Sequence, residues 1–295
     1  MEQLSVGVIG AGRVGAVLAA ALRQAGYRIA AVAGESDASR ARIRALLPGV
    51  PVSKPTTVAK ACDLLLLTVP DDALDNVVRM LVASKSIRAG QYVVHTSGLH
   101  GLAVLRPALA VGAHGIALHP ALTFTGTDDD LSRLAGCVYG VTVEELDYDV
   151  VSALVASLHG RLARVDEANR PLYHAALAHG ANHLVTLVTQ AINLLSQAGA
   201  DDPAATLRPL LSAALDNSLT SADAALTGPV VRGDVDSVRE HLRVLRLSAA
   251  PSTLESYISL AKATVGFAAL DGRLEPRRAA ILLELLEEAG SPVGA

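Results

Sequence analysis

The first half of the chain alternates short apolar runs with amphipathic segments. The first run, Val6 to Ile9, has no polar side chain, and later runs fall within residues 27–34, 62–74, 91–101, 114–126, 137–143 and 160–165. Continuous apolar runs of this length are typical of parallel strands that helices cover on both faces. The pattern predicts an α/β fold with a Rossmann-type parallel sheet.

The second half of the chain is predicted to be helical. From about Asp166 onward the strand signals disappear. We therefore expect two domains, a Rossmann-like domain over residues 1–166 and an all-helical domain over residues 167–295. Asn169 and Gly199 are the start and stop signals of one continuous helix of about thirty residues, which is long enough to be central to the helical domain.

A glycine-rich turn follows the first apolar run. Gly10, Gly12 and Gly15 form the pattern G-x-G-x-x-G at a junction of strand and helix, which makes it more specific than the bare pattern. The first glycine permits the tight bend, the second lets the backbone approach a pyrophosphate, and the third lets helix and strand pack closely. The helix N-terminus offers unpaired N–H groups to the phosphates. The predicted cofactor contacts are Gly10, Ala11, Gly12, Arg13, Val14 and Gly15.

The residues after the second strand decide between NAD and NADP. An NAD site places an acidic residue there to bind the ribose hydroxyls. This chain has Ser36, Ser39 and Arg40, which can hold a 2′-phosphate, and Arg13 in the glycine turn can assist. Glu35 is the competing residue and would favour NAD if it pointed inward. We expect NADPH and NADP+ to be the cofactors.

Polar residues follow the later strands, at the edge where open α/β sheets bind ligands. Val69, Pro70 and Asp71 follow one strand, and Thr96 and Ser97 follow the next. All five are expected to contact the cofactor. For Thr96 and Ser97, contact with the substrate is the alternative.

These strand ends also have structural interpretations. Asp71 and Asp72 are suited to capping a helix. His95 and His119 are as well suited to a structural hydrogen bond as to catalysis. The sequence leaves both alternatives open.

The composition is that of a well-buried globular protein. Hydrophobic residues make up 51% of the chain and charged residues 18%, and the formal net charge is −4. The negative charge and the scattered arginines argue against a nucleic-acid surface. No apolar run approaches the roughly 20 residues that a membrane helix needs. Cys62 and Cys137 form no disulfide framework and the first residues carry no export signal, so we expect a cytoplasmic protein that contacts neither nucleic acid nor membrane.

Five further motifs carry a family resemblance. They are TVPDDAL (68–74), HTSGLHG (95–101), HPALTFTG (119–126), YHAALAHGANH (173–183) and LTGPVVRGD (226–234). Over nearly its whole length the chain resembles Rossmann-like proteins with a DUF2520 C-terminal domain, in the 6-phosphogluconate dehydrogenase-like superfamily. Some members of that group are regarded as PanG-type ketopantoate reductases of pantothenate biosynthesis. The resemblance implies an NADPH-dependent reductase, with 2-dehydropantoate as the first candidate substrate.

The chain departs from related reductases at one position. Ketopantoate reductases and β-hydroxyacid dehydrogenases generally place a catalytic lysine four residues before an asparagine on the first long helix. Here Asn182 is present, but the residue four positions earlier is Ala178, and the four lysines of the chain lie elsewhere. The proton donor must be another group, or the protein is not a reductase of that type.

The stretch YHAALAHGANH supplies candidates for that group. At about 100° per residue, the helix is expected to bury an apolar face that consists of Leu177, Ala181, Leu184, Val188 and Leu195. His174 and Asn182 lie along the border of that face, where a helix can line a cleft. His179 and His183 lie roughly opposite, where solvent or an interface is expected. Their spacing suits zinc, but the glutamate of H-E-x-x-H and a third ligand are missing, so we expect no metal.

The predicted reaction is hydride transfer from NADPH to the carbonyl carbon of a small 2-oxo acid. His174 would protonate the developing alkoxide, Asn182 would orient its oxygen, and Ser97 would contact the substrate. Arg232 would bind the substrate carboxylate in a bidentate pair. The alternative for Arg232 is a salt bridge with Asp234 in the same loop.

The same scaffold supports other functions. Imine reduction, as in pyrroline-5-carboxylate reductases, and dehydrogenation of the prephenate type are the enzymatic alternatives. A non-catalytic NADP(H)-binding redox sensor is the alternative from another class. The helical half also has more apolar residues than one small domain needs to bury, and relatives commonly pair through it. We therefore expect a homodimer that forms through the helical domain.

Overall fold

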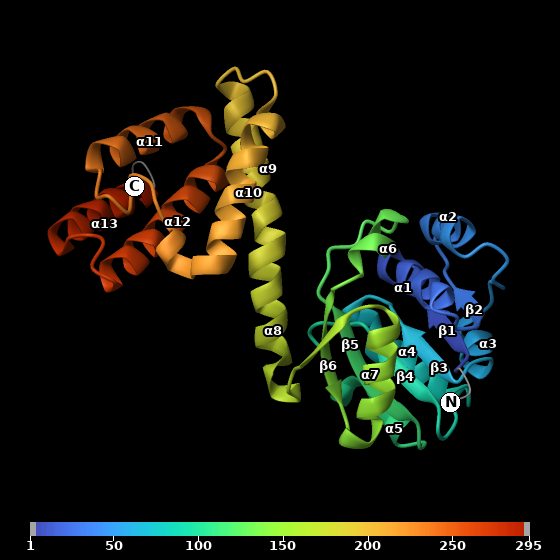
Figure 1. Ribbon diagram of the computed structural model, residues 1–295. Coiled ribbons are helices and arrows are strands. Elements are labelled where there is room, and N and C mark those ends of the chain that lie inside the picture. Colours follow the sequence, from blue (N-terminus) through green and yellow to red (C-terminus); the bar gives the residue numbers. More distant parts are fainter. Residues whose placement is uncertain (1–3, 292–295) are drawn as a thin grey trace. The chain divides into compact units, whose positions relative to one another are not determined.

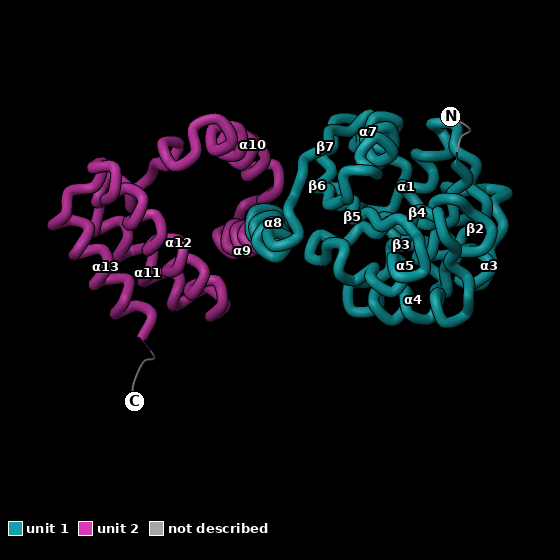
Figure 2. Tube along the Cα trace, turned by 90° about the horizontal axis from the view of Figure 1, so that it is seen from below, with its two compact units in different colours: residues 1–181 teal, residues 182–295 magenta. Residues whose placement is uncertain are grey.

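A computed structural model of the chain describes residues 4–291. The chain forms two compact units, Met1–Ala181 and Asn182–Ala295, which Figure 2 shows in two colours. The first unit holds the sheet and the second is helical. The boundary between the units lies later than the predicted boundary at residue 166, because the helix that begins at Arg170 is bonded to the sheet.

The first unit is built on a seven-stranded sheet (Figure 1). In the order β2-β1-β3-β4-β5-β6-β7, its strands are β2 (Ile29–Ala33), β1 (Val6–Ile9), β3 (Leu64–Leu67), β4 (Tyr92–His95), β5 (His114–Pro120), β6 (Val138–Val143) and β7 (Arg161–Arg164). All seven predicted strands and the predicted fold class are confirmed. The sheet is not purely parallel, because β6 runs antiparallel to β5. The carboxyl ends of β1 to β5 therefore share one edge, whereas β6 and β7 end at the other.

Helices cover both faces of the sheet (Figure 1). On one face lie α1 (Arg13–Gln24), α2 (Asp37–Leu46), α6 (Asp129–Arg133) and α7 (Tyr148–Ser157). On the other lie α3 (Pro55–Lys60), α4 (Asp71–Ala83) and α5 (Arg106–Leu109). The strands are thus buried on both sides, as their continuous apolar sequence predicts.

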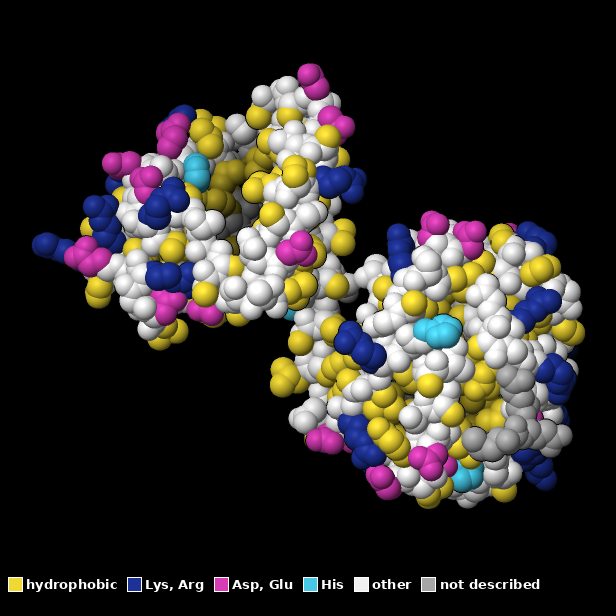
Figure 3. Space-filling model, viewed as in Figure 1, with side chains coloured by type: hydrophobic (Ala, Val, Ile, Leu, Met, Phe, Trp, Pro, Cys, Tyr) yellow, Lys and Arg dark blue, Asp and Glu magenta, His cyan; other side chains and the backbone are white. Residues whose placement is uncertain are grey.

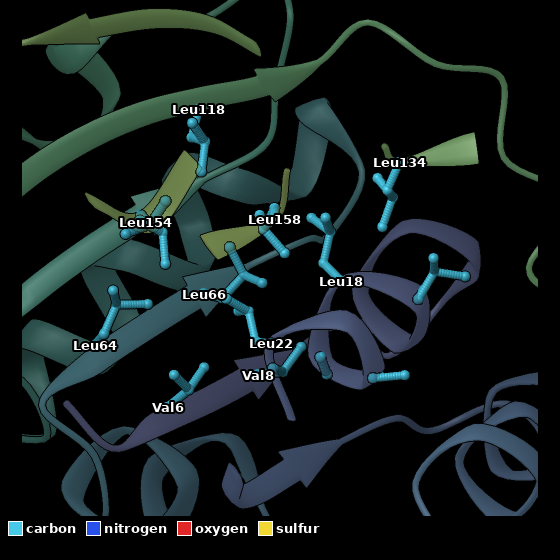
Figure 4. Packing of buried hydrophobic residues seen from close by; sticks show 14 of the residues in the cluster. Val6, Val8, Leu18, Leu22, Leu64, Leu66, Leu118, Leu134, Leu154 and Leu158 are labelled. Atoms are coloured by element: carbon cyan, nitrogen blue, oxygen red, sulfur yellow. The ribbon is translucent and has the colours of Figure 1, made fainter. Parts of the chain in front are cut away.

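Each central strand contributes side chains to two separate cores. Val8 and Leu66 lie in the core under α1, together with Leu18 and Leu22 of that helix (Figure 4). Leu67, the next residue along β3, lies in the core under α3 and α4. Successive side chains of a strand point to opposite faces, so a strand between two helical layers needs apolar residues at every position.

The second unit is helical throughout its described residues. Its helices are α9 (His183–Gln197), α10 (Pro203–Ser221), α11 (Val235–Ser248), α12 (Pro251–Leu270) and α13 (Pro276–Gly290). α11, α12 and α13 share a core that includes Val238, Val265 and Leu282. No residue of α9 is buried, and Leu207 is the one buried residue of α10. Among residues 4–291, no helix has both the length and the apolar character needed to cross a membrane.

The long helix predicted after Asn169 is not regular. α8 (Arg170–Leu177) is followed by a π-helical turn, η4 (Ala178–Asn182), and then by α9. A π-helix bonds residues five apart instead of four, so every residue beyond the turn is rotated relative to a regular α-helix. Of the predicted apolar face, Leu177, Val188 and Leu195 are half-buried, whereas Ala181 and Leu184 are exposed.

Candidate functional site

The turn between β1 and α1 has the geometry that its glycines predict. Gly10 has a φ of +95°, a conformation that a residue with a side chain rarely adopts. The Thr68 hydroxyl, just after β3, donates a 2.7 Å hydrogen bond to the carbonyl oxygen of Gly10 and ties the turn to the sheet. Gly12 is the N-cap of α1, so the first N–H groups of that helix lack acceptors within it and suit an anion.

Gly15 fits tightly beneath this turn. A Cβ atom at Gly15 would collide with the Thr68 hydroxyl and lie 2.6 Å from the carbonyl oxygen of Gly10. A Cβ atom at Gly12 would meet the Gly10 carbonyl oxygen at 3.8 Å and no other atom within 4 Å. Close packing at Gly15 and open space at Gly12 are the conditions for a pyrophosphate on the turn.

A cleft of about 690 Å³ begins at this turn. The predicted site residues in its walls are Gly10, Gly12, Val14, Ser36, Val69, Pro70, Asp71, Thr96 and Ser97. Ala11 and Gly15 are buried, and Arg13 is exposed at the start of α1. Asp71 and Asp72 lie in the first turn of α4 without capping it by a side-chain hydrogen bond.

The rim of the cleft after β2 differs from the prediction in one residue. Ser36 caps α2 by accepting a 3.1 Å hydrogen bond from the N–H of Ser39, and both serines line the cleft, as does the exposed Glu35. The Arg40 guanidinium donates a 2.8 Å hydrogen bond to the Glu35 carbonyl oxygen and is not part of the cleft wall. Arg42 is the arginine in the wall, and the role of Arg40 in the cofactor site remains a prediction.

A buried carboxylate holds a second segment against Arg42. Asp130 accepts hydrogen bonds from the backbone N–H groups of Thr125 and Gly126, both at 2.8 Å. Burial raises the pKa of Asp130, but these hydrogen bonds outweigh burial and bring the pKa below its ordinary value. A Cβ atom at Gly126 would lie 2.7 Å from Arg42 Nε and 3.0 Å from Arg13 Cγ. Both arginines therefore pack on this segment, at the rim of the cleft.

The last residue of β4 has a structural role. His95 is fully buried, and its Nδ1 accepts a 3.2 Å hydrogen bond from the N–H of Ser97. Its Nε2 lies 2.9 Å from the carbonyl oxygen of Gly101 and must therefore carry the proton. Burial lowers the pKa of His95 to about 4, so the ring is neutral at pH 7. With both nitrogens bonded, the structure favours the structural alternative for His95.

The loop after β4 is held from two directions. The Ser97 hydroxyl accepts a 3.0 Å hydrogen bond from the N–H of His100. The Glu167 carboxylate accepts hydrogen bonds from the N–H groups of Leu102, at 2.6 Å, and Ala103, at 3.0 Å. These bonds fix the segment that lines the cleft.

Arg170, the first residue of α8, is fully buried next to this loop. Its guanidinium donates to the carbonyl oxygens of Ser97, Ala117 and Gly140 at 3.2, 3.0 and 3.1 Å, and to the Thr142 hydroxyl at 2.8 Å. Within residues 4–291, no carboxylate forms an ion pair with it. Burial lowers its pKa, although an arginine stays charged at pH 7. Arg170 thus links three segments of the sheet and places a positive charge behind Ser97.

Two imidazole rings and a phenol gather at the end of β5. His119 Nδ1 lies 3.0 Å from the hydroxyl oxygen of Tyr173. The rings of His119 and His174 pack edge to face, with centroids 6.4 Å apart. A Cβ atom at Gly98 would lie 2.9 Å from His174 Cδ2 and 3.1 Å from His119 Nε2. Both rings therefore lie against Gly98, which directly follows Ser97 of the cleft wall.

His119 is neutral at physiological pH. Burial is the main reason that its pKa is lowered to about 4. The charge of Arg170 and the neighbouring His174 lower the pKa further, whereas Asp71 acts in the opposite direction.

The remaining predicted residues belong to the second unit. Asn182, at the end of η4, and Arg232, in the loop before α11, are exposed residues of the second unit. No ion pair joins Arg232 to Asp234, both of which the structure describes. Asp234 instead caps α11 by accepting a 3.1 Å hydrogen bond from the N–H of Ser237. The roles of Asn182 and Arg232 remain predictions.

The two histidines considered for zinc are exposed. His179 lies in η4 and His183 begins α9. Among residues 4–291, no group of three or more His, Cys, Asp and Glu side chains is arranged to hold a metal ion.

Three residues of this arrangement were not predicted. Arg42 follows Arg40 by two residues, and Arg170 and Tyr173 precede His174 on the same helix. All three lie close in the sequence to residues that were predicted, Arg40 and His174. Residue type and spacing alone, however, do not show which of two nearby arginines faces a cleft. Tyr173 could have been considered as a hydroxyl partner for a histidine, whereas nothing local indicates that Arg170 is buried.

The sheet, the glycine turn and the cleft define a Rossmann-like α/β domain, which this chain joins to a helical domain. Residues 1–120 match the family model of the Rossmann-like domain, and residues 137–264 match that of a domain of unknown function, DUF2520. The chain belongs to the Rossmann-like proteins with a DUF2520 domain, as the five motifs indicated. The DUF2520 match begins just before β6, so this family includes the last two strands of the sheet.

Solved structures of other proteins share the fold. A Bacteroides fragilis protein described as an NADP oxidoreductase has a TM-score of 0.76 and 21% identity, covering 89% of this chain and 98% of its own. An imine reductase from Pseudomonas sp. has a TM-score of 0.65 and 18% identity, covering 98% and 99%. A pyrroline carboxylate reductase from Plasmodium falciparum, with NADP bound, has a TM-score of 0.56 and 14% identity, covering 99% and 100%. A comparison with functionally curated proteins gave no match.

Proposed function

We propose that the protein is an NADPH-dependent reductase of small 2-oxo acids, with 2-dehydropantoate as the first candidate substrate. The observation that carries the proposal is the cleft itself. It extends from the glycine turn to Thr96 and Ser97, and the rings of His119 and His174 pack on the next residue, Gly98. Rossmann sheets bind dinucleotides at this edge, and a carbonyl reductase needs a proton donor near the nicotinamide end. The resemblance to PanG-type reductases supports this assignment.

The residues of the cleft fit NADPH. The open side of Gly12 and the N-terminus of α1 suit the pyrophosphate. Ser36 and the arginines Arg42 and Arg13 suit a 2′-phosphate, which arginine binds more strongly than a neutral donor does. Thr96 and Ser97 suit the nicotinamide, which supplies a hydride when the cofactor is bound. These residues hold and orient the cofactor, and the imidazoles beyond them are left for the substrate.

The charge of Arg170 favours an anionic substrate. Its guanidinium is buried, has no carboxylate partner among the described residues, and touches the backbone of Ser97 in the cleft wall. A positive charge in a region of low dielectric stabilises a carboxylate and the negative charge that develops on a reduced carbonyl oxygen. Arg232 stays a candidate for direct contact with the carboxylate, and Asn182 for orienting the carbonyl oxygen.

An NADPH oxidation assay with a panel of substrates tests the proposal. We expect turnover with 2-dehydropantoate, followed as the loss of NADPH fluorescence, and little turnover when NADH replaces NADPH. Mixtures without protein and mixtures without the oxo acid are the controls. NADPH binding without turnover of any 2-oxo acid would contradict the substrate class.

Imine reduction is the second candidate function, because the chain shares its fold with an imine reductase and a pyrroline carboxylate reductase. Pyrroline-5-carboxylate in the same panel separates the two, since it presents a C=N bond in place of a C=O bond. Prephenate with NADP+ tests the dehydrogenase alternative. Tight NADPH binding with no turnover in any of these assays would favour a redox sensor.

We further propose that the protein forms a homodimer through its helical unit. Large apolar side chains are exposed on α9, α10 and α12, with exposed fractions of 63% for Val185, 80% for Leu219 and 88% for Leu270. Figure 3 shows apolar side chains around a hollow in this unit, and a cavity of about 260 Å³ there is lined by residues such as Leu194 and Leu260. Exposed apolar surface of this extent is typical of an interface, and a second copy offers the same surface.

Light scattering tests the dimer. We expect a mass near twice the 30.4 kDa of the chain at micromolar concentration. Glutamate at Leu215 and Leu219 should shift the mass to that of one chain, because charged side chains would have to be buried in the interface. Leu146→Glu is the matched control, since Leu146 is 74% exposed but belongs to the first unit. A single-chain mass for the unaltered protein would rule the dimer out.

A further inference from the structure

His119 is fixed in the sheet at the end of the cleft. It is the penultimate residue of β5 and pairs with Gly140 of the antiparallel strand β6. Its Nε2 atom faces Gly98, at 3.1 Å from the position of a Cβ atom there, and Gly98 directly follows the cleft residue Ser97. A side chain that is anchored in a strand is held in place better than one on a loop. Nε2 is therefore held in a fixed position against Gly98, one residue beyond the cleft wall.

Tyr173 determines which nitrogen of His119 carries the proton. Burial raises the pKa of the Tyr173 hydroxyl above its ordinary value, and the charge of Arg170 opposes this only in part. The hydroxyl oxygen lies against Gly140, where a Cβ atom would collide with it. Its own proton can point to His119 Nδ1, 3.0 Å away. His119 then carries its proton on Nε2, the nitrogen that faces Gly98.

We propose that His119 and Tyr173 form a proton relay to the substrate, with His119 Nε2 as the direct donor and Tyr173 as the group behind it. The inference rests on the reductase function proposed above and deepens it. It names His119, where the sequence favoured His174, as the residue that protonates the substrate oxygen. His119 is a catalytic residue in this scheme, and Tyr173 acts through it.

The proposed step conserves atoms and charge. NADPH held by the cleft residues would supply the hydride to the carbonyl carbon and would be left as NADP+, with the electron pair of the C=O π bond on the substrate oxygen. The oxygen takes the proton from His119 Nε2, while Nδ1 takes the proton of the Tyr173 hydroxyl, so no imidazolate forms. The charge of the Arg170 guanidinium, whose central carbon lies 5.9 Å from the ring centroid, stabilises the Tyr173 phenolate that remains. The relay is reset when Nε2 takes a proton from solvent and Nδ1 returns its proton to the phenolate oxygen.

A neutral histidine suits this role. Burial, Arg170 and His174 keep the ring uncharged at pH 7, with Asp71 as the opposing carboxylate. A neutral imidazole with a second hydrogen-bond partner can polarise a carbonyl group and pass on a proton, an arrangement known from triosephosphate isomerase. A charged imidazolium would instead add a second buried cation next to Arg170, which is costly.

His174 is the competing donor. Its ring also lies against Gly98, but among the described residues no hydrogen bond reaches it, whereas His119 is backed by Tyr173. A histidine without such a partner gives up a proton readily only as the imidazolium. The two candidates therefore differ in their response to pH.

The kinetic test uses three variants of the full-length protein. Tyr173→Phe removes only the hydroxyl and should lower kcat at least about tenfold, and His119→Gln should lower it by roughly 10² to 10⁴. The dissociation constant of NADPH should change less than twofold in both. Tyr92→Phe is the matched control, because Tyr92 starts β4, at the far edge of the sheet, and its kcat should be unchanged. For the unaltered protein, kcat should vary little from pH 6 to 8, whereas an imidazolium donor loses about tenfold per pH unit above its pKa.

A second measurement does not depend on turnover. In nitrogen-15 NMR spectra at pH 7, His119 should be the neutral Nε2–H tautomer, and Tyr173→Phe should shift its Nδ1 resonance. Oxamate, an unreactive analogue of a 2-oxo acid, should shift the Nε2 resonance when added with NADPH.

Two results would contradict the relay while leaving the proposed reductase function intact. One is turnover that survives both Tyr173→Phe and His119→Gln but is lost in His174→Gln. The other is an Nδ1–H tautomer or a charged ring for His119 at pH 7. If the unaltered protein turns over none of the oxo acids or imines, the reductase function fails, and the relay fails with it as a catalytic device.

Discussion

Valine at Gly15 should severely weaken NADPH binding. The first side-chain atom would collide with the Thr68 hydroxyl and lie 2.6 Å from the carbonyl oxygen of Gly10. These two groups are joined by a 2.7 Å hydrogen bond, so neither can move without breaking the turn. Helix α1 would have to withdraw from β3, and its N–H groups would leave the position that the pyrophosphate needs.

We expect Gly15→Val to weaken NADPH binding by more than about 100-fold, which corresponds to about 3 kcal/mol. The overpacked contact should also lower the free energy of unfolding by about 1–3 kcal/mol. Titration calorimetry and urea denaturation measure the two effects. Gly266→Val, on α12, is the matched control, since a Cβ atom there meets nothing within 4 Å. Normal NADPH binding by Gly15→Val would show that the cofactor does not use this turn.

Loss of Arg42 should remove the preference for NADPH over NADH. A hydrogen bond to a charged group contributes about 1.5–3 kcal/mol, so Arg42→Ala should weaken NADPH binding by about 10- to 100-fold. NADH has no 2′-phosphate, and its affinity should hardly change. Arg13→Ala should act in the same direction, because Arg13 packs on Gly126 together with Arg42.

Calorimetric titrations with both cofactors measure this preference. Arg44→Ala is the control, because Arg44 is an exposed arginine of the same helix that does not line the cleft. A larger effect for Arg40→Ala than for Arg42→Ala would restore the assignment that the sequence favoured. Equal affinities of the unaltered protein for NADPH and NADH would indicate that Glu35 governs the site.

The sheet and its glycine turn could be predicted because their signals are local. A strand buried on both faces must be apolar at every position, and Leu64–Leu67 shows this in four consecutive leucines. The bend at Gly10 needs a backbone conformation that glycine alone adopts easily, so the pattern of glycines marks the turn. The alternation of strand and helix predicts the remaining strands, but not that β6 runs antiparallel to β5.

The errors arose where tertiary contacts decide the outcome. Reading YHAALAHGANH at a fixed angle assumed an unbroken α-helix, and η4 invalidates that assumption beyond Ala178. Arg40 and Arg42 are both on α2, and the packing of Gly126 against Arg42 distinguishes them. His119 and Tyr173 are far apart in the sequence, so their 3.0 Å contact could not be seen without the fold.

A protein that buries a guanidinium without a carboxylate partner leaves part of its charge balance to the solution. We expect small anions to bind the folded chain in the cleft beside Ser97, a site that the unfolded chain lacks. By mass action such binding would shift the unfolding equilibrium toward the folded chain. Melting temperatures in phosphate or citrate should therefore exceed those in a zwitterionic buffer of equal ionic strength. For this molecule, we expect the anion chosen for storage and assay to act as a ligand.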